Sequence, residues 1–197
     1  MIIAGVAPAE YYIRATFPND LGSFVMTQRR TFFAEYPYFV TFRTKEGFQL
    51  FEKVAYAELM AQFIRRTCSM KGFEIIAWQI MPDHVHLLIQ NIHPRAQASL
   101  PARTRLHSRA PAEGCARGNY NVSQCMHTIK SYFCRQIRTQ YGIRFAVFQK
   151  RFYARAVTSQ RYFDTVIRYI AYNPVKAELP SRYRKPPYQY VHPMVHL

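Results

Sequence analysis

Acidic residues are scarce in this chain of 197 residues, and their scarcity narrows the choice of partners. Eleven Asp and Glu stand against 27 Lys and Arg, so the formal net charge is +16 at neutral pH. An excess of positive charge on this scale is typical of a protein that binds a polyanion. We therefore expect nucleic acid as the partner, in preference to a membrane surface.

Long apolar runs and closely paired cysteines are also missing, and we expect no leader sequence. No apolar run reaches the roughly 18 residues that a transmembrane helix needs, and residues 1–18 lack the basic start of a secretory signal. The four cysteines include no C-x-x-C pair, which argues against a zinc ribbon and predicts reduced thiols. We expect a cytoplasmic protein, associated with the bacterial nucleoid.

Apolar and aromatic residues, by contrast, are plentiful enough to build a core. They make up 49% and 16% of the chain, which excludes a disordered protein. The length fits one domain. We expect an irregular N-terminal arm over 1–30, a single domain over 31–180 and a C-terminal tail over 181–197. A Pro-, Ala- and Arg-rich stretch over 91–118 predicts a basic loop inserted in the domain.

Hydrophobic periodicity predicts seven elements in the order βαββαβα. The predicted strands cover 38–43, 73–80, 84–90 and 153–157, and the predicted helices cover 51–70, 123–141 and 160–173. Pro174 is expected to end the last helix. The first six elements follow the ferredoxin-like pattern. The predicted fold class is therefore α+β, a ferredoxin-like βαββαβ unit with an antiparallel sheet and an additional C-terminal helix.

Two histidines, His84 and His86, open a predicted strand directly after a Pro-Asp turn. Side chains two positions apart on a strand point to the same face, so both imidazoles can converge on one metal ion. Val85 between them is expected to point the other way, into apolar packing. The alternative interpretation is an ordinary pair of half-exposed strand histidines.

A tyrosine and an asparagine share one stripe of the last predicted helix. Tyr169 and Asn173 lie four residues apart, which places them one above the other on the helix surface. An asparagine oxygen suits a hard divalent ion, so this stripe could approach the histidines from the opposite side. Two plainer interpretations stay open: Tyr169 packs at the edge of the core, or Asn173 only caps the helix.

These motifs resemble those of a known family. The segments concerned are Met81-Pro82-Asp83-His84-Val85-His86-Leu87 and Tyr169-Ile170-Ala171-Tyr172-Asn173-Pro174-Val175-Lys176-Ala177. In this order they resemble the single-tyrosine HUH transposases, and most closely the REP-associated tyrosine transposases. Two shorter stretches, at 41–43 and 148–153, add to the resemblance. It covers about residues 36–180.

The resemblance implies a role for each of these side chains. His84 and His86 would bind a divalent metal, Mg²⁺ or Mn²⁺, and Asn173 would be the third protein ligand. Zn²⁺ is a further candidate on ligand chemistry alone. Tyr169 would be the nucleophile, leaving a 5′-phosphotyrosine and a free 3′-OH. The implied activity is DNA transposition, by cleavage and rejoining of single-stranded DNA that contains a hairpin; a homodimer is compatible with it.

Basic residues outside these motifs are the candidates for contacts with DNA phosphates. Six of them cluster in the predicted elements around the motifs: Arg43, Lys130, Arg135, Lys150, Arg151 and Arg155.

Four alternatives remain at this point. Tyr172 ranks second as the nucleophile. The fold could also serve a non-catalytic nucleic-acid-binding module, a metal-dependent phosphodiesterase that uses water, or a domesticated transposase that acts as a regulator.

Overall fold

A single five-stranded antiparallel sheet organises the computed structural model, which describes residues 32–33, 35–92 and 120–195. The expected arm over 1–30 and residues 93–118 of the expected loop lie outside this part of the chain. The sheet order is β4-β1-β3-β2-β5. The strands are β1 (Tyr38–Arg43), β2 (Phe73–Ile80), β3 (His84–Asn91), β4 (Tyr153–Ala156) and β5 (Gln189–Val191).

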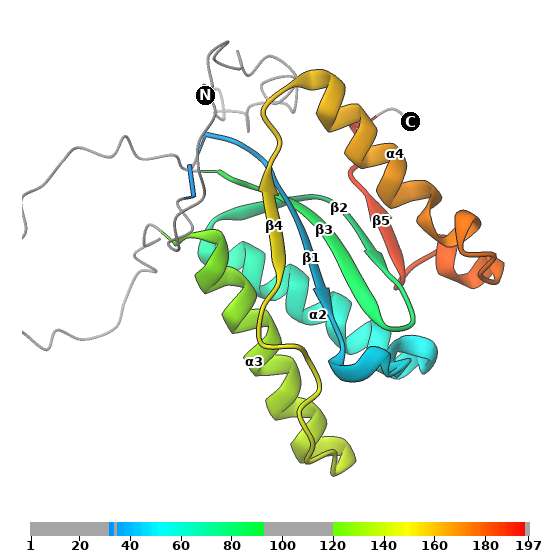
Figure 1. Cartoon of the computed structure of the whole chain (residues 1–197). Coiled ribbons are helices and arrows are strands. Elements are labelled where there is room, and N and C mark those ends of the chain that lie inside the picture. Colours follow the sequence, from blue (N-terminus) through cyan, green and yellow to red (C-terminus); the bar gives the residue numbers. More distant parts are fainter. Residues whose placement is uncertain (1–31, 34, 93–119, 196–197) are drawn as a thin grey trace, which may run out of the picture.

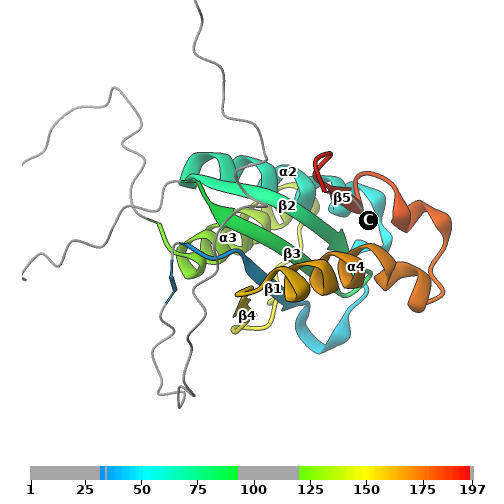
Figure 2. The ribbon, with the colours of Figure 1, turned by 90° about the horizontal axis from the view of Figure 1, so that it is seen from above.

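Three helices cover the two faces of this sheet. Two of them, α2 (Val54–Lys71) and α3 (Val122–Tyr141), pack on one face, and α4 (Gln160–Lys176) packs against β2 and β3 on the other (Figures 1 and 2). Short 3₁₀ turns lie at Lys45–Gly47, Leu50–Glu52 and Ser181–Arg184. The α+β class and the predicted βαββαβ order with an added helix are confirmed. No helix in the described part of the chain is long and apolar enough to span a membrane.

Strand β3 separates two apolar clusters because its side chains alternate between the faces. Val85, Leu87 and Ile89 are fully buried in the larger cluster beneath α2 and α3. Leu88 belongs to the smaller cluster, where α4 contributes Val166, Ile167 and Ile170. His84 and His86 share the α4 face with Leu88, as their even spacing requires.

Helix α4 differs from the prediction at its C-terminal end. The helix passes through Pro174 and ends at Lys176, whereas the sequence predicted an end at Asn173. Pro174 lacks the N–H that would bond back into the helix, but the turn still closes. The Ala177 N–H donates to the Asn173 carbonyl (3.0 Å), and the Leu179 N–H donates to the Pro174 carbonyl (2.9 Å). The proline ring is buried, so packing compensates for the missing bond.

The segment expected as a C-terminal tail contributes to the sheet. Within 181–197, β5 pairs with Ala77–Gln79 of β2 and extends the sheet by one strand. Three residues are too few to show the alternation that marks a strand in sequence, which is why the pattern missed it. At the other helices the differences are small: α2 begins at Val54 after a 3₁₀ turn, and α3 begins at Val122.

Candidate active site

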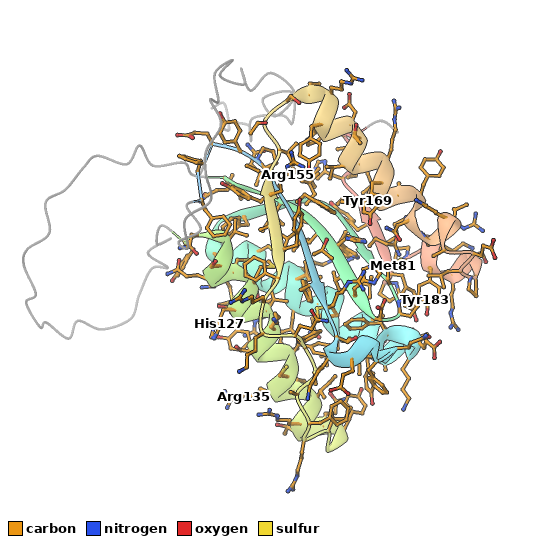
Figure 3. All side chains as sticks on the ribbon, viewed as in Figure 1. Met81, His127, Arg135, Arg155, Tyr169 and Tyr183 are labelled. Carbon is orange, nitrogen blue, oxygen red and sulfur yellow. The ribbon has the colours of Figure 1, made fainter. Side chains whose placement is uncertain are left out.

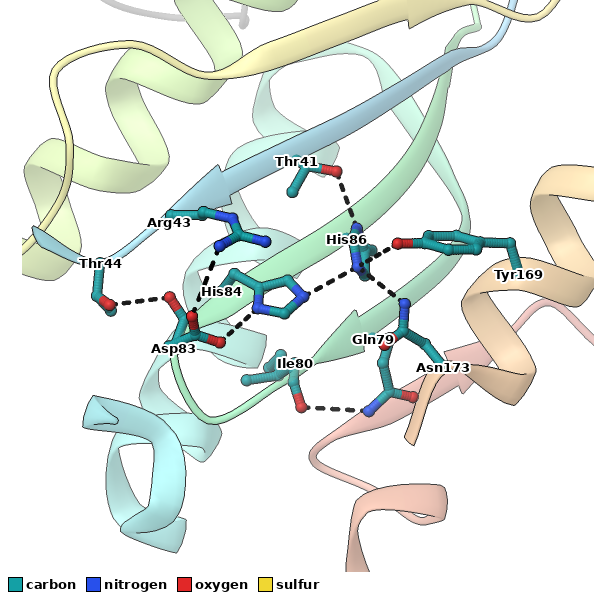
Figure 4. A network of polar contacts seen from close by, with 10 residues as sticks. All are labelled: Thr41, Arg43, Thr44, Gln79, Ile80, Asp83, His84, His86, Tyr169 and Asn173. Atoms are coloured by element: carbon teal, nitrogen blue, oxygen red, sulfur yellow. Dashed lines mark hydrogen bonds and ion pairs between the residues drawn. The ribbon is translucent and has the colours of Figure 1, made fainter. Parts of the chain in front are cut away.

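Two imidazoles form the centre of the candidate site. The Nε2 atoms of His84 and His86 lie 3.1 Å apart, on the face of β3 that α4 covers (Figure 4). His86 is only 3% exposed. Strand geometry brings the two rings together as expected, and it directs Val85 into the opposite core.

The outer nitrogen of each imidazole has its own partner. His84 Nδ1 donates to Asp83 Oδ1 (2.5 Å), and His86 Nδ1 lies 2.8 Å from the Thr41 hydroxyl oxygen. Thr44 in turn holds the Asp83 carbonyl through its backbone N–H and its hydroxyl. In the tautomer that carries the proton on Nδ1 and donates it outward, each Nε2 keeps its lone pair toward the other ring. Metal-binding histidines usually show this arrangement, because the outer bond fixes ring and tautomer.

The charge state of His86 follows from its surroundings. Burial, with smaller contributions from His84 and Arg43, lowers the pKa of His86 from its ordinary value of 6.5 to about 3. The imidazole is therefore neutral at physiological pH, and its lone pair is free to bind a cation.

Helix α4 brings two further groups to the same point. The Tyr169 hydroxyl lies 3.4 Å from His86 Nε2, and the Asn173 side-chain nitrogen lies 3.1 Å from it (Figure 4). Tyr169 is 45% exposed, and Tyr172 is 61% exposed. Tyr169 and Asn173 lie one turn apart on one face of α4, as the helix pattern predicted.

The convergent donor set fits a divalent cation. Two imidazole nitrogens and a carboxamide meet within hydrogen-bond distance, and a half-turn of the Asn173 amide presents its oxygen in place of its nitrogen. Two lone pairs at 3.1 Å repel each other unless a proton or cation lies between them. Elsewhere in the described chain, and here, no three His, Cys, Asp or Glu side chains form a metal cluster. The candidate centre therefore depends on the amide as its third ligand.

The six basic candidates do not gather in one place. Arg43 lies at the site, 4.0 Å from Asp83, and Arg155 lies on β4 with its guanidinium over the ring of Tyr162 (5.0 Å). Lys150 and Arg151 are exposed just before β4. The other two, Lys130 and Arg135, belong to α3 in the opposite layer, and Figure 3 shows Arg135 well separated from Tyr169.

Lys130 has a visible structural task. Its ammonium donates to the carbonyls of Gln149 (2.5 Å) and Lys150 (3.4 Å), so it anchors the segment that leads into β4. Partial burial lowers the pKa of Lys130 below its ordinary value.

Sequence reasoning missed a pair of glutamines that fastens α4 to the sheet. Gln79 is fully buried beside His86, its neighbour across the β2–β3 pairing. Its side-chain oxygen accepts from Gln189 Nε2 (2.9 Å), and Gln189 Nε2 also donates to the Ala171 carbonyl of α4 (2.9 Å). Ala171 lies between the two site residues of the helix. The one signal in the sequence is a lone polar residue inside the apolar run of β2.

We expect the change Gln189→Met to loosen the C-terminal half of α4 without unfolding the protein. Methionine keeps the shape of glutamine but donates no hydrogen bond, so the Ala171 carbonyl and Gln79 lose a partner. Hydrogen exchange of the amides at 171–177 should rise roughly fivefold. The matched change Gln140→Met, at an exposed site on α3, should leave these amides unaffected. Unchanged hydrogen exchange at 171–177 in Gln189→Met would contradict the inference that the Gln79–Gln189 pair, the glutamine clamp, fastens α4 to the sheet.

Comparison with known proteins supports the resemblance seen in the motifs. Residues 33–101 match the family described as IS200-like transposase. A REP-associated tyrosine transposase bound to a REP hairpin superposes with a TM-score of 0.56, at 19% identity, over 83% of this chain and 82% of that one. A protein from Deinococcus radiodurans, provisionally described as a transposase, gives 0.43 at 16% identity, over 74% of this chain and 95% of its own.

The relationship rests on the family match and on the shared fold. No curated protein matches the sequence significantly. At 19% identity the superposition establishes a shared fold. The resemblance of this chain to the IS200-like transposases, and among solved structures to a REP-associated tyrosine transposase, is thereby confirmed.

Proposed function

We propose that this protein is a metal-dependent endonuclease and strand transferase that cleaves and rejoins single-stranded DNA through a 5′-phosphotyrosine at Tyr169. One observation carries the proposal: the Tyr169 hydroxyl, the His84–His86 pair and the Asn173 amide converge around His86 Nε2. The ring of Tyr169 packs against Phe39 and His86, and this packing places its hydroxyl 3.4 Å from His86 Nε2. An attacking hydroxyl beside a cation site does need this arrangement.

The reaction exchanges one phosphate ester for another. The Tyr169 oxygen bonds to the scissile phosphorus, the bond to the 3′ oxygen breaks, and the phenol proton is lost while the 3′ oxygen gains one. The number of phosphodiester bonds is unchanged, so rejoining needs no nucleotide cofactor. Phe39 supports the nucleophile, because its ring meets that of Tyr169 edge-on at 5.8 Å.

His84, His86 and Asn173 would hold the divalent metal, with Mg²⁺ or Mn²⁺ suited to the mixed nitrogen and oxygen set. A bound divalent ion would supply positive charge to the phosphate oxygens, where negative charge develops during attack by a weakly nucleophilic phenol. Asp83 and Thr41 keep the two imidazoles oriented for this task.

The proposed substrate is single-stranded DNA with a hairpin. The support is the REP hairpin bound by the structurally similar transposase, together with the net charge of +16. One chain supplies the imidazoles, the amide and the tyrosine, so the site is assembled without a second copy. A homodimer stays a prediction that sedimentation would test. The proposed place of action is the cytoplasm, at the nucleoid.

The test is to detect the covalent intermediate. The protein is incubated with labelled oligonucleotides covering both strands of the DNA that flanks its own gene, with Mn²⁺ or Mg²⁺, and resolved on a denaturing gel. We expect a DNA adduct that a chelator abolishes. Cleavage without any adduct would favour a water-using phosphodiesterase. Binding without cleavage would favour a non-catalytic module or a regulator.

Salt should weaken DNA binding steeply. If about six phosphates are contacted, affinity for single-stranded DNA should fall roughly 10²- to 10³-fold between 50 and 200 mM salt. Arg155 lies on the site face. Replacing it by Ala should lower the slope of log affinity against log salt concentration by about 0.7. Arg135 on α3 provides the comparison, since its change tests whether DNA also reaches the opposite layer. Fluorescence anisotropy measures both slopes, and a salt-insensitive complex would contradict the proposal.

A further inference from the structure

In the described part of the chain, the sheet face that carries the site leaves two side chains of β4, Tyr153 and Arg155, exposed. Helix α4 packs mainly on β2 and β3 and lies to one side of β1 and β4 in Figure 1, although its Tyr169 and Tyr162 rings contact Phe39 and Arg155. Antiparallel pairing aligns Thr41 with Tyr153 and Phe39 with Arg155, so these four side chains share the site face. The exposed surface of β4 therefore adjoins the candidate site, with Phe39 between them.

An unbroken series of rings runs across this surface. The Phe39 ring stacks on His86 at 5.6 Å with an angle of 24° between planes, and it meets Tyr153 edge-on at 6.2 Å. Phe39 also contacts Tyr169. One phenylalanine thus joins the nucleophile and the metal-site imidazole to Tyr153. Tyr153 is 50% exposed, although it lies in a strand, where a polar side chain would face water at lower cost.

The charges around Tyr153 favour an anionic ligand. Arg155 is exposed two residues away, and its guanidinium is steadied by the ring of Tyr162. Arg43 lies at the other side of the site and is more than half exposed. Residues 148–163 contain no Asp or Glu, but four basic residues: Lys150, Arg151, Arg155 and Arg161. A nucleotide complements this surface, because its base can stack on an exposed ring and its negative phosphate can pair with a guanidinium.

We propose that Tyr153 is a stacking subsite for an unpaired base of the single strand that enters the active site, with Phe39 supporting it and Arg155 contacting the adjacent phosphate. The inference rests on the proposed function, and it extends that function by locating the path of the strand from the scissile phosphate toward β4. Stacking on an aromatic ring tolerates every base, so this subsite would hold the strand without selecting its sequence.

The subsite is tested by removing the Tyr153 ring from the protein, the bases from the DNA strand, or both, and comparing the affinities. The probes are a fluorescein-labelled thymidine 20-mer and a 20-mer of the same backbone whose positions are all abasic, and binding is followed by anisotropy. Tyr153→Ala should weaken binding of the thymidine strand about tenfold and leave the abasic strand unchanged. Tyr153→Phe should bind both strands like the unmodified protein, since stacking needs the ring and not the hydroxyl.

The control is Tyr132→Ala, which removes a 39% exposed tyrosine from α3 in the opposite layer and should change neither affinity. Tyr153→Ala with normal affinity for the thymidine strand would overturn the subsite, and so would an equal loss on both strands. The covalent adduct is assayed separately. An adduct without any effect at Tyr153 would refute the subsite alone, and a base-dependent loss without any adduct would refute the chemistry alone.

Discussion

Replacing Tyr169 by Phe should abolish the covalent protein–DNA complex, lowering its rate of formation by at least about a thousandfold. The change removes only the hydroxyl, because phenylalanine can keep the edge-on contacts of the ring with Phe39 and His86. The metal ligands and the basic surface are untouched. Binding of the same oligonucleotide should therefore stay within about twofold, and a denaturing gel beside a binding titration separates the two effects.

Tyr172→Phe is the matched control for this experiment. Tyr172 lies on the same helix but is 61% exposed, whereas the Tyr169 hydroxyl lies 3.4 Å from His86 Nε2. We expect normal adduct formation in Tyr172→Phe. An adduct that survives in Tyr169→Phe and is lost in Tyr172→Phe would reassign the nucleophile, and α4 would then have to rotate on the sheet for the reaction.

The core of the fold could be predicted because its pattern is local. Alternation along β3 separates Val85 and Leu87 from His84 and His86, and the same rule decides which residues can meet a metal. On α4, the 3.6-residue period buries Ile167 and Ile170 and leaves Tyr169 and Asn173 together on another stripe. Neither conclusion needs knowledge of distant contacts.

The features that escaped prediction depend on distant contacts. Strand β5 is three residues long and exists because β2 offers it a pairing edge. The Gln79–Gln189 clamp joins positions 110 residues apart, and nothing near either glutamine marks it. The six basic candidates look alike in sequence, yet tertiary structure places Arg43 at the site and Arg135 in the other layer. A helix that continues through Pro174 likewise depends on the packing of its ring.

The change His84→Ala should lower the rate of adduct formation by at least about a hundredfold. It should weaken Mn²⁺ binding by at least about tenfold, while single-stranded DNA still binds. Alanine removes one imidazole nitrogen from the His86 Nε2 centre and takes the imidazole partner away from the Asp83 carboxylate. Electron paramagnetic resonance of free Mn²⁺ measures the affinity directly, so metal binding is followed independently of cleavage.

His127→Ala gives the matched comparison, because His127 is an exposed histidine of α3 (Figure 3). It should retain both Mn²⁺ affinity and adduct formation. A purely DNA-binding protein of this fold would be indifferent to both changes, since its strand histidines would serve no ion. If His84→Ala formed adducts at the normal rate, the convergence of His84, His86 and Asn173 would be a packing arrangement, and the attack by Tyr169 would have to find its positive charge in arginines such as Arg43.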